Sequence, residues 1–505
     1  MGVRKAAGHY VTGLSRRERI LDAADTLFRE CGTGAPSVHD VARAAGISRP
    51  GLLRYFASKE ELLDGLLDRY EARAAAAAED ARPRDAPSPG GIVAGPTGDR
   101  AVTTTAGPAA DPVGDRVATT TAWPAADAPL LSDAPSALVA QALRQAAVPG
   151  YVECLTSLAG EAVRADHPAH ARMARRYRDL RADILRQLGP GLGPGCAAGV
   201  DSASVPGLGP GSAPNNDTDS APRFGPDPDV AATCLLAGWE GLQLLSLYSP
   251  SDIDVAACLE RRLRFLATPP SPPRPARRTS PTPEEAARRA RVFRDLRAED
   301  VRDLQERRGY ATGHERRRQV IDTATTLFGT RGFHGISLRD IAKAVGISHS
   351  TLLHHFANKD ELLRAVLTHH DYLMITVGSV PDNADEHARL SAVVETARRA
   401  ADDTPGLMEL FSTVSAEAVA PGHPAHAYFE KHFAMSRRFL ARSFEHLAAD
   451  GELSAERDPA EEGLWLLAVC EGLQRLRLYD AGIDAAGLLA ADLARTLGEP
   501  LPTVG

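Results

Sequence analysis

The sequence predicts an all-α protein built from two similar halves. Two segments, SVHDVARAAGISRPGLLRYFASKEE at 37–61 and SLRDIAKAVGISHSTLLHHFANKDE at 337–361, each have the pattern of two short helices joined by a tight turn. Helical spacing of apolar residues returns after the first segment, at 134–188 and 229–266, and equivalents follow the second segment. These observations predict two three-helix domains of the helix-turn-helix type, each followed by a helical bundle.

The residues of the second segment account for each part of its helix-turn-helix. Ser337 and Asp340 have the spacing of a capping box, which satisfies the free N–H groups at a helix start. Gly346 stands where the turn requires a residue that tolerates positive φ. Leu352 and Phe356, four residues apart, predict the buried face of the following helix. The other side chains of that helix therefore point outward.

The first segment repeats this arrangement without a gap. The equivalent cap, turn glycine and buried positions are Ser37, Asp40, Gly46, Leu52 and Phe56. A helical pattern precedes both segments, RRERILDAADTLF at 16–28 and RRRQVIDTATTLF at 316–328, and F-x-x-K-x-E-L-L ends both. With these flanking helices, residues 10–71 and 310–371 resemble the N-terminal domain of the tetracycline-repressor (TetR) family of transcriptional regulators.

The resemblance implies which side chains contact DNA: residues at the start and on the outward face of the second helix, a lysine after it, and basic residues of the preceding helix. In the first half these are Arg16, Arg17, Ser37, Arg49, Pro50, Gly51, Arg54, Tyr55 and Lys59. In the second half they are Arg316, Arg317, Ser337, His349, Ser350, Thr351, His354, His355 and Lys359. Arginine favours guanine edges and a threonine methyl packs on thymine, so the two surfaces predict different half-sites.

Both halves depart from the family at one position, and the first half departs at a second. Leu53 and Leu353 stand where many members have a tyrosine, so a phosphate contact is lost there in both halves. Gly51 also lacks the usual hydroxyl in the first half.

The chain is organised as a duplication. VPGYVECLTSLAGEAVRADHPAHA at 148–171 aligns with TPGLMELFSTVSAEAVAPGHPAHA at 404–427, and WEGLQLLSLY at 239–248 aligns with CEGLQRLRLY at 470–479. We expect a flexible arm at 1–14 and these regions: a helix-turn-helix domain at 1–75, a disordered Pro/Gly/Ala/Thr-rich linker at 76–133, a helical effector and dimerisation domain at 134–268 with a loose insertion at 189–228, a Pro-rich spacer and charged helix at 269–309, a second helix-turn-helix domain at 310–372, and a second helical domain at 373–500.

The net charge of −8 is unusual for a DNA-binding protein until it is resolved along the chain. Residues 15–59 hold eight Lys/Arg against five Asp/Glu, and residues 310–359 hold seven against three. The basic excess thus coincides with the helix-turn-helix segments.

The sequence predicts neither an enzyme nor a membrane protein. It has no phosphate-binding loop, nucleophile elbow or HExxH motif, and we expect no cofactor. The HPAH segments at 167–170 and 423–426 have metal-ligand types, yet their prolines and lack of neighbouring ligands favour a structural role and no metal. No apolar run reaches about 18 residues and no signal peptide is present, so we expect a cytoplasmic protein.

The predicted function is a DNA-binding transcriptional regulator, a ligand-responsive repressor that acts on a double-stranded DNA operator. The family resemblance implies homodimers with a small-molecule pocket in the helical domain, and the effector here is unknown. Because one chain holds two halves, they are expected to pair as an intrachain pseudo-dimer on an asymmetric operator, with a further homodimer as a second option. The alternative is a helical scaffold protein in which one or both helix-turn-helix units no longer bind DNA.

Overall fold

A computed structural model of the chain describes residues 3–32, 36–80, 136–188, 227–267, 311–333, 335–377, 384–399 and 406–501. Every secondary-structure element in these residues is a helix, which confirms the all-α prediction. The predicted linker at 76–133 beyond residue 80, most of the insertion at 189–228 and the spacer with its charged helix at 269–309 lie outside the described residues.

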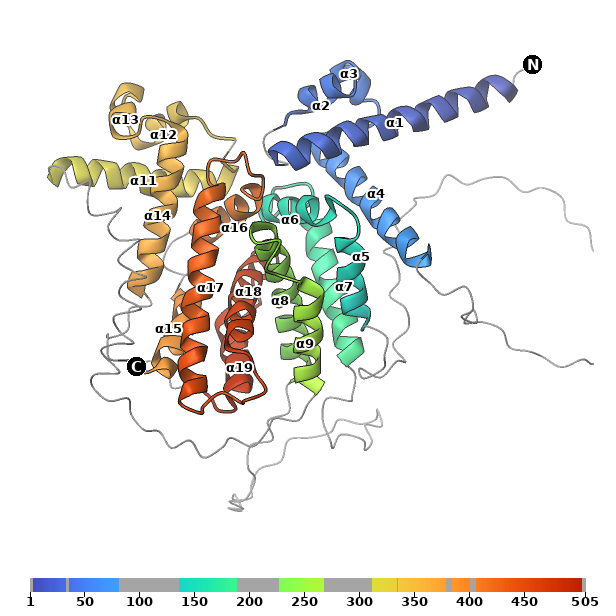
Figure 1. Cartoon of the computed structure of the whole chain (residues 1–505). Coiled ribbons are helices and arrows are strands. Elements are labelled where there is room, and N and C mark those ends of the chain that lie inside the picture. The colour runs from blue at the N-terminus through green and yellow to red at the C-terminus, as the bar shows by residue number, and fades with distance from the viewer. Residues whose placement is uncertain are drawn as a thin grey trace, which may run out of the picture.

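The helices follow the order of the duplication (Figure 1). The first helix-turn-helix unit holds α1 (Val3–Cys31), α2 (Val38–Ala44), α3 (Arg49–Leu52) and α4 (Lys59–Asp80), and its bundle holds α5 (Ala137–Ala146), α6 (Tyr151–Glu161), α7 (His170–Leu188), α8 (Pro228–Tyr248) and α9 (Val255–Ala267). The second unit holds α11 (Ala311–Arg331), α12 (Leu338–Val345), α13 (His349–His355) and α14 (Lys359–Val377), followed by α15 (Glu386–Arg399), α16 (Leu407–Glu417), α17 (His426–Ala449), α18 (Pro459–Tyr479) and α19 (Ala485–Leu497). The arm expected over 1–14 is instead helical from Val3. We call residues 1–268 the first copy and 310–500 the second copy.

Capping hydrogen bonds and a glycine with positive φ determine where the helices begin and end in both helix-turn-helix units. The Ser37 hydroxyl accepts a hydrogen bond from the Asp40 N–H at 3.3 Å, and the Asp40 carboxylate accepts from the Ser37 N–H at 3.0 Å. Ser337 and Asp340 repeat this box with the same two distances. Gly46 and Gly346 have φ of 67° and 77°, as the turn requires. The predicted caps and turn are therefore confirmed in both copies.

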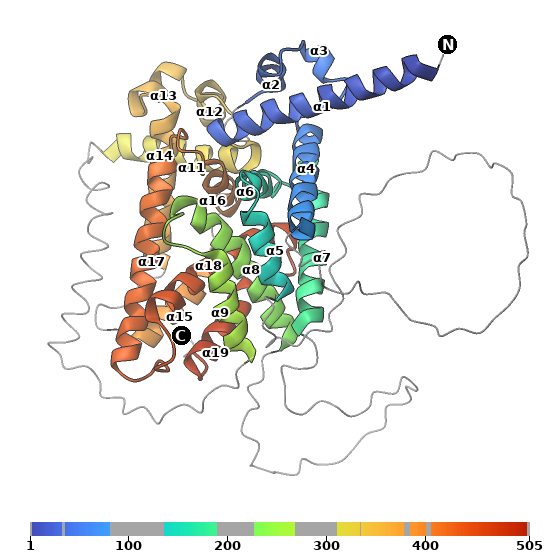
Figure 2. The same ribbon diagram turned by 45° about the vertical axis from the view of Figure 1, so that its right-hand side comes forward.

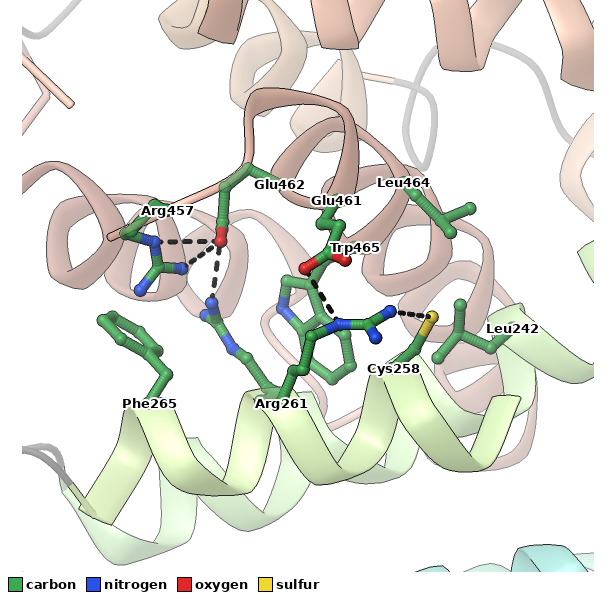
Figure 3. Close-up of a pocket in the computed structure, with 10 residues that line it drawn as sticks. Leu242, Cys258, Arg261, Phe265, Arg457, Glu461, Glu462, Leu464 and Trp465 are labelled. Atoms are coloured by element: carbon green, nitrogen blue, oxygen red, sulfur yellow. Dashed lines mark hydrogen bonds and ion pairs between the residues drawn. The ribbon is translucent and has the colours of Figure 1, made fainter. Parts of the chain in front are cut away.

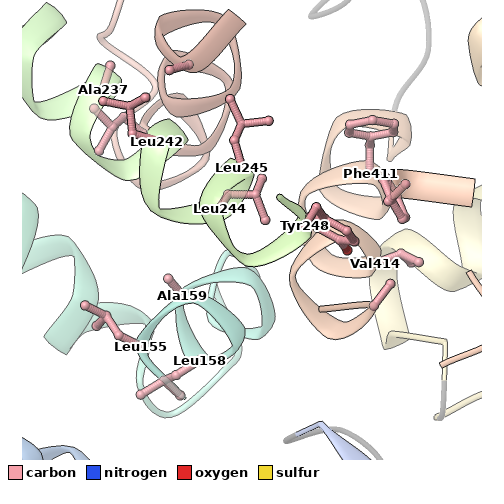
Figure 4. Packing of buried hydrophobic residues seen from close by; sticks show 14 of the residues in the cluster. Leu155, Leu158, Ala159, Ala237, Leu242, Leu244, Leu245, Tyr248, Phe411 and Val414 are labelled. Atoms are coloured by element: carbon pink, nitrogen blue, oxygen red, sulfur yellow. The ribbon is translucent and has the colours of Figure 1, made fainter. Parts of the chain in front are cut away.

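The helices α8 and α18 pack against each other at the centre of the molecule (Figure 1). The helices α6 and α16 pack against each other at one end of this pair (Figure 4). By length and composition alone, α8 is the one described helix that could cross a membrane, because an 18-residue window within its 21 residues has a mean hydropathy of 1.4. Polar residues such as Glu240 and Gln243 interrupt it, so it is not a continuous apolar run. The reason for this composition is burial, because 83% of its most apolar window lies inside the protein. A helix surrounded by other helices is apolar on all sides.

The contacts between the two copies occur in matched pairs. A Cβ placed on Gly241 of α8 would lie 1.9 Å from the Ala468 carbonyl oxygen of α18, and a Cβ on Gly472 would lie 1.9 Å from that of Ala237. Gly241 is equivalent to Gly472 in the alignment above, and Ala237 is equivalent to Ala468 at the same offset of 231 residues. Only glycine permits so close an approach of two helices at each position.

Hydrogen bonds between the copies repeat the same exchange. The Tyr248 hydroxyl donates to the Ser415 carbonyl at 2.6 Å, and the equivalent Tyr479 hydroxyl donates to the Ala159 carbonyl at 2.5 Å. Figure 4 shows Tyr248 at the end of α8, beside Val414 of α16. A contact that recurs with the partners exchanged is the signature of a two-fold interface.

The two HPAH segments have structural roles at this interface. The His170 Nδ1 atom lies 2.8 Å from the Ala162 carbonyl oxygen, and its ring stacks on Tyr479 of the second copy. His426 repeats both contacts, with the Ala418 carbonyl at 2.8 Å and with the Tyr248 ring. The predicted structural role of these histidines is thus confirmed.

Candidate nucleic-acid interface

The second helix of each helix-turn-helix, α3 or α13, is its recognition helix. Both recognition helices lie at the end of the molecule opposite α9 and α19 (Figures 1 and 2). The buried side is the same in both copies: Leu52 and Leu352 are fully buried, and so are Phe56 and Phe356. The outward side of each helix is therefore free to face a ligand.

In the first copy, the basic residues predicted to read DNA are exposed. Arg49, Pro50 and Arg54 are exposed, whereas Gly51 is half-buried behind the Ser48 cap, whose hydroxyl oxygen accepts from the Gly51 N–H at 3.2 Å. Tyr55 departs from the prediction. It is half-buried and packs against the core, because it follows the end of α3 and its ring lies back on the domain.

In the second copy, the predicted residues on α13 itself are polar and include no arginine. Ser350, Thr351 and His354 are exposed, and His349 and His355 are half-buried. Partial burial lowers the pKa of His355, and the positive charges of His354 and the Arg316–Arg317 pair lower it further. The lowered pKa favours the neutral imidazole of His355, which offers one hydrogen-bond donor and one acceptor.

Each recognition surface also includes an exposed leucine. Leu53 and Leu353 are 36% and 39% exposed, which places them among the few large apolar side chains at the surface of the described residues. They occupy the position where a tyrosine was expected from the family resemblance, and a leucine offers apolar contact in place of a hydrogen bond.

The arginine pairs before each recognition helix divide into two roles. Arg16 and Arg316 are exposed, as expected for phosphate contacts. The guanidinium of Arg17 lies over the Phe56 ring, 5.0 Å from its centroid, and that of Arg317 lies 4.6 Å from the centroid of the Phe356 ring. These cation–π contacts attach α1 to the end of α3 and α11 to the end of α13, a role that the sequence prediction missed.

The serines and lysines of the predicted set are also engaged within the protein. Ser37 and Ser337 act in the capping boxes described above. The Nζ atom of Lys359 lies 4.3 Å from the centroid of the Phe333 ring, and burial lowers its pKa. Lys59 is half-buried, so neither lysine extends freely from the surface.

One charged residue of the junction was not predicted. Glu417, at the end of α16, is only 5% exposed, and burial raises its pKa to about 8, with nearby Glu161 adding to the shift. A Cβ on Gly32 would lie 3.2 Å from its carbonyl oxygen, and one on Gly332 would lie 3.7 Å from its Oε1 atom. Glu417 thus contacts the end of α1 and the end of α11, in both helix-turn-helix units.

Two cavities lie between the copies in the described bundle. The larger, of about 150 Å³, is lined by Leu245, Asp252, Phe433, Arg437 and Leu467 among others. The smaller, of about 50 Å³, lies between α9 and α18 and is lined by Phe265, Arg457, Glu462 and Trp465 among others (Figure 3).

Comparisons with known proteins agree with this geometry. The family model described as "Bacterial regulatory proteins, tetR family" matches residues 20–66 and again 320–366. The chain is 30% identical over 127 residues to the transcriptional repressor KstR2 of Rhodococcus jostii, which is 25% of this chain and 54% of that protein. It therefore spans about half the length of KstR2.

It is 25% identical over 179 residues to the transcriptional regulator UidR of Escherichia coli, which is 35% of this chain and 84% of that protein. A solved complex of SmeT with triclosan matches 38% of this chain and 98% of that chain, at 18% identity and a TM-score of 0.34.

Proposed function

The chain belongs to the TetR family, with one family domain in each half, and we propose that it is a transcriptional repressor whose two copies pair within one chain on an asymmetric operator. Family members are regulators and not enzymes. We place its action in the cytoplasm, on double-stranded DNA.

The recognition surfaces support the DNA-binding part of this proposal. Arg49 and Arg54 are exposed on one surface, and Thr351 and His354 are exposed on the other. Arg16 and Arg316 stand beside them as exposed cations, suited to phosphate oxygens. The residues proposed to contact DNA are the predicted ones, with four changes: Ser37 and Ser337 act as caps, Arg17 and Arg317 support the helices, Tyr55 packs inward, and the half-buried Lys59 and Lys359 do not extend freely from the surface.

The matched contacts between α8 and α18 support pairing within the chain, and they are the observation that carries the proposal. Gly241 and Gly472 exchange partners across the two copies, and so do Tyr248 and Tyr479. A dimer of two chains would make these contacts with identical residues. Here one chain supplies both sides, so no second chain is needed to complete the interface.

The unlike recognition surfaces support an asymmetric operator. An arginine prefers guanine, whereas a threonine methyl packs on thymine and a neutral imidazole accepts or donates one hydrogen bond. Two half-sites of different sequence follow if the two copies bind side by side.

We also propose a small-molecule effector of the helical regions, as the family implies. The 150 Å³ cavity supports this, since its wall is formed by both copies, from α8 and α17. Because both copies line the cavity, its shape changes when the copies move relative to each other. A ligand therefore binds one arrangement of the copies more tightly than another, which is what an effector requires. Leu245 and Phe433 offer apolar contact, and Arg437 lies 3.5 Å from Asp252 at the rim.

The test uses the purified full-length chain. Fragments selected from a genomic library are sequenced, the bound site is footprinted, and the mass of the complex is measured. We expect one chain on two dissimilar half-sites, with affinity that falls steeply with salt. A symmetric palindrome occupied by two chains contradicts the pairing, and binding without salt dependence favours the scaffold alternative.

A further inference from the structure

The last helix of each bundle, α9 or α19, has the same start and the same length. The Asp254 carboxylate accepts from the Ala257 N–H at 2.9 Å, and the Asp484 carboxylate accepts from the Gly487 N–H at 3.0 Å. Each aspartate immediately precedes a helix of 13 residues. The two helices can therefore be aligned residue by residue. The eighth residue is Arg262 in the first copy and Asp492 in the second.

These two equivalent residues contact each other across the interface. An Arg262 Nη2 atom donates to the Asp492 carboxylate at 2.5 Å, and the two side chains are only 4% and 7% exposed. The carboxylate also accepts from the Trp465 Nε1–H at 3.0 Å. The Arg262 guanidinium lies over the Trp465 and Phe265 rings, 4.9 Å and 4.7 Å from their centroids.

The eleventh residues of the same helices follow this pattern. They are Phe265 in the first copy and Arg495 in the second, and the Arg495 guanidinium lies 5.1 Å from the centroid of the Phe265 ring. Arg495 also donates to the Leu266 carbonyl oxygen at 2.9 Å. At the eighth position the arginine of the first copy contacts an aspartate of the second copy. At the eleventh position the arginine of the second copy contacts a phenylalanine of the first copy.

A residue that contacts its own equivalent lies on the axis that relates two copies. In a pair of two identical copies, that residue would face itself. Two first copies would bury Arg262 against Arg262, and two second copies would bury Asp492 against Asp492. Glu462 of the second copy also lies 3.6 Å from Arg262, but its equivalent in the first copy is Ala231, so two first copies would lack both acidic partners. Like charges buried without an opposite charge are strongly destabilising.

We propose that the Arg262–Asp492 pair determines which surfaces associate: a first copy accepts only a second copy, and association of like copies from different chains is excluded. The bundle of the first copy, with Arg262 at the contact, therefore pairs with a bundle that has an acidic residue there, and the bundle of the second copy, with Asp492, pairs with one that has a basic residue. This inference rests on the proposed pairing of the two copies, and it adds the reason why chains do not associate through like copies.

A charge-exchange series in the full-length chain tests the proposal. Arg262→Asp gives two aspartates at the contact, and Asp492→Arg gives two arginines. We expect each single variant to melt about 5–15 °C below the wild type. The double variant R262D/D492R restores opposite charges and should melt above both single variants. Its recovery is partial, because an arginine side chain has no acceptor for the Trp465 N–H.

The matched control is an exposed ion pair between α9 and α18, which also joins the two copies. Arg261 on α9 lies 2.8 Å from Glu461 on α18, and their side chains are 45% and 41% exposed. Arg261→Glu and Glu461→Arg should each shift the melting temperature by less than about 2 °C, because exposed ion pairs contribute little.

A mixing experiment measures partner choice directly. The R262D chain carries aspartate in both copies, and the D492R chain carries arginine in both. By light scattering, we expect equal amounts of the two variants to form a complex of two chains that neither variant forms alone.

The proposal is overturned if the double variant melts no higher than the less stable single variant. It is also overturned if the mixture keeps the mass of one chain. A wild-type mass of two chains would instead contradict the proposed intrachain pairing. If the single variants fail to fold, Asp492→Asn keeps an acceptor for Trp465. It should melt below the wild type, and no change would count against the proposal.

Discussion

The two recognition helices share one scaffold and, apart from the exposed Leu53 and Leu353, differ in what faces outward. The helix α3 has four residues, Arg49–Leu52, whereas α13 has seven, His349–His355. In α13 the Ser348 hydroxyl accepts from the Thr351 N–H at 3.0 Å and lies 2.7 Å from its hydroxyl, and no such side-chain contact is available to Gly51. The buried leucine and phenylalanine hold either helix, so the scaffold leaves its length and surface free to diverge.

The largest expected effect tests whether the scaffold is shared. Leu352→Ala should destabilise the second helix-turn-helix by about 2–5 kcal/mol, because Leu352 is fully buried, and Leu52→Ala should cost the first unit a similar amount. Hydrogen exchange of the α3 and α13 amides reports the opening of each unit separately. Strongly unequal costs would show that helix length, and not the buried face, sets stability.

The next effect concerns what each helix reads. Arg54→Ala should weaken binding by about 1–3 kcal/mol on the half-site of the first copy and leave the other half-site unchanged. His354→Ala is the matched variant in the second copy and should act only there. Titrations with operators that carry one half-site at a time measure both effects. An equal loss on both half-sites would contradict two separate readers.

A third effect is common to both units, because Glu417 contacts each of them. Its folded-state pKa of about 8 exceeds the ordinary value of 4.5, so the folded chain binds more protons than the unfolded chain. The associated stability is complete below about pH 4.5 and is lost as the pH rises through about 8.

Glu417→Gln should remove this decline, so that its melting temperature changes less than that of the wild type between pH 5 and 9. The exposed Glu430 of α17 serves as control, since Glu430→Gln should keep the wild-type slope. Melting temperatures measured from pH 5 to 9 check the sign. A wild-type melting temperature that does not fall over this range would argue against a buried, protonated Glu417.

The smallest expected effect sharpens the difference between α3 and α13. Gly51→Thr copies the residue of the second unit and should stabilise the first unit by about 0.2–0.4 kcal/mol, because glycine lowers helix stability slightly more than threonine does. A Cβ at this position would lie 3.1 Å from the Ser48 hydroxyl oxygen, and the same arrangement is accommodated at Thr351 and Ser348. Slower hydrogen exchange in α3 is the expected result, and faster exchange would show that the added side chain is strained.

The features that were predictable from sequence depend on residues three or four positions apart. The capping boxes at Ser37 and Ser337 and the positive φ of Gly46 and Gly346 are local, so the residue types and their spacing suffice. The outward face of each recognition helix followed from the same helical spacing, and most of its predicted residues are exposed.

The features that were not predictable depend on tertiary contacts. Arg17 is paired with Phe56 and Arg317 with Phe356 by the angle between two helices, which periodicity does not reveal. Helical spacing predicts an outward Tyr55 only if α3 continues to that residue. Because α3 ends at Leu52, Tyr55 packs against the core instead. The junction at Glu417 joins residues from three segments, and composition alone gives no sign of it.

The exchanged contacts of Gly241 and Gly472 bear on how the proposed repressor would respond to its own abundance. When a regulator must first dimerise with a second chain, the occupancy of its operator at low concentration rises with the square of the chain concentration. If both surfaces arrive in one polypeptide, as proposed, occupancy rises in direct proportion to the number of chains. Silencing would then persist in a cell that holds very few of them.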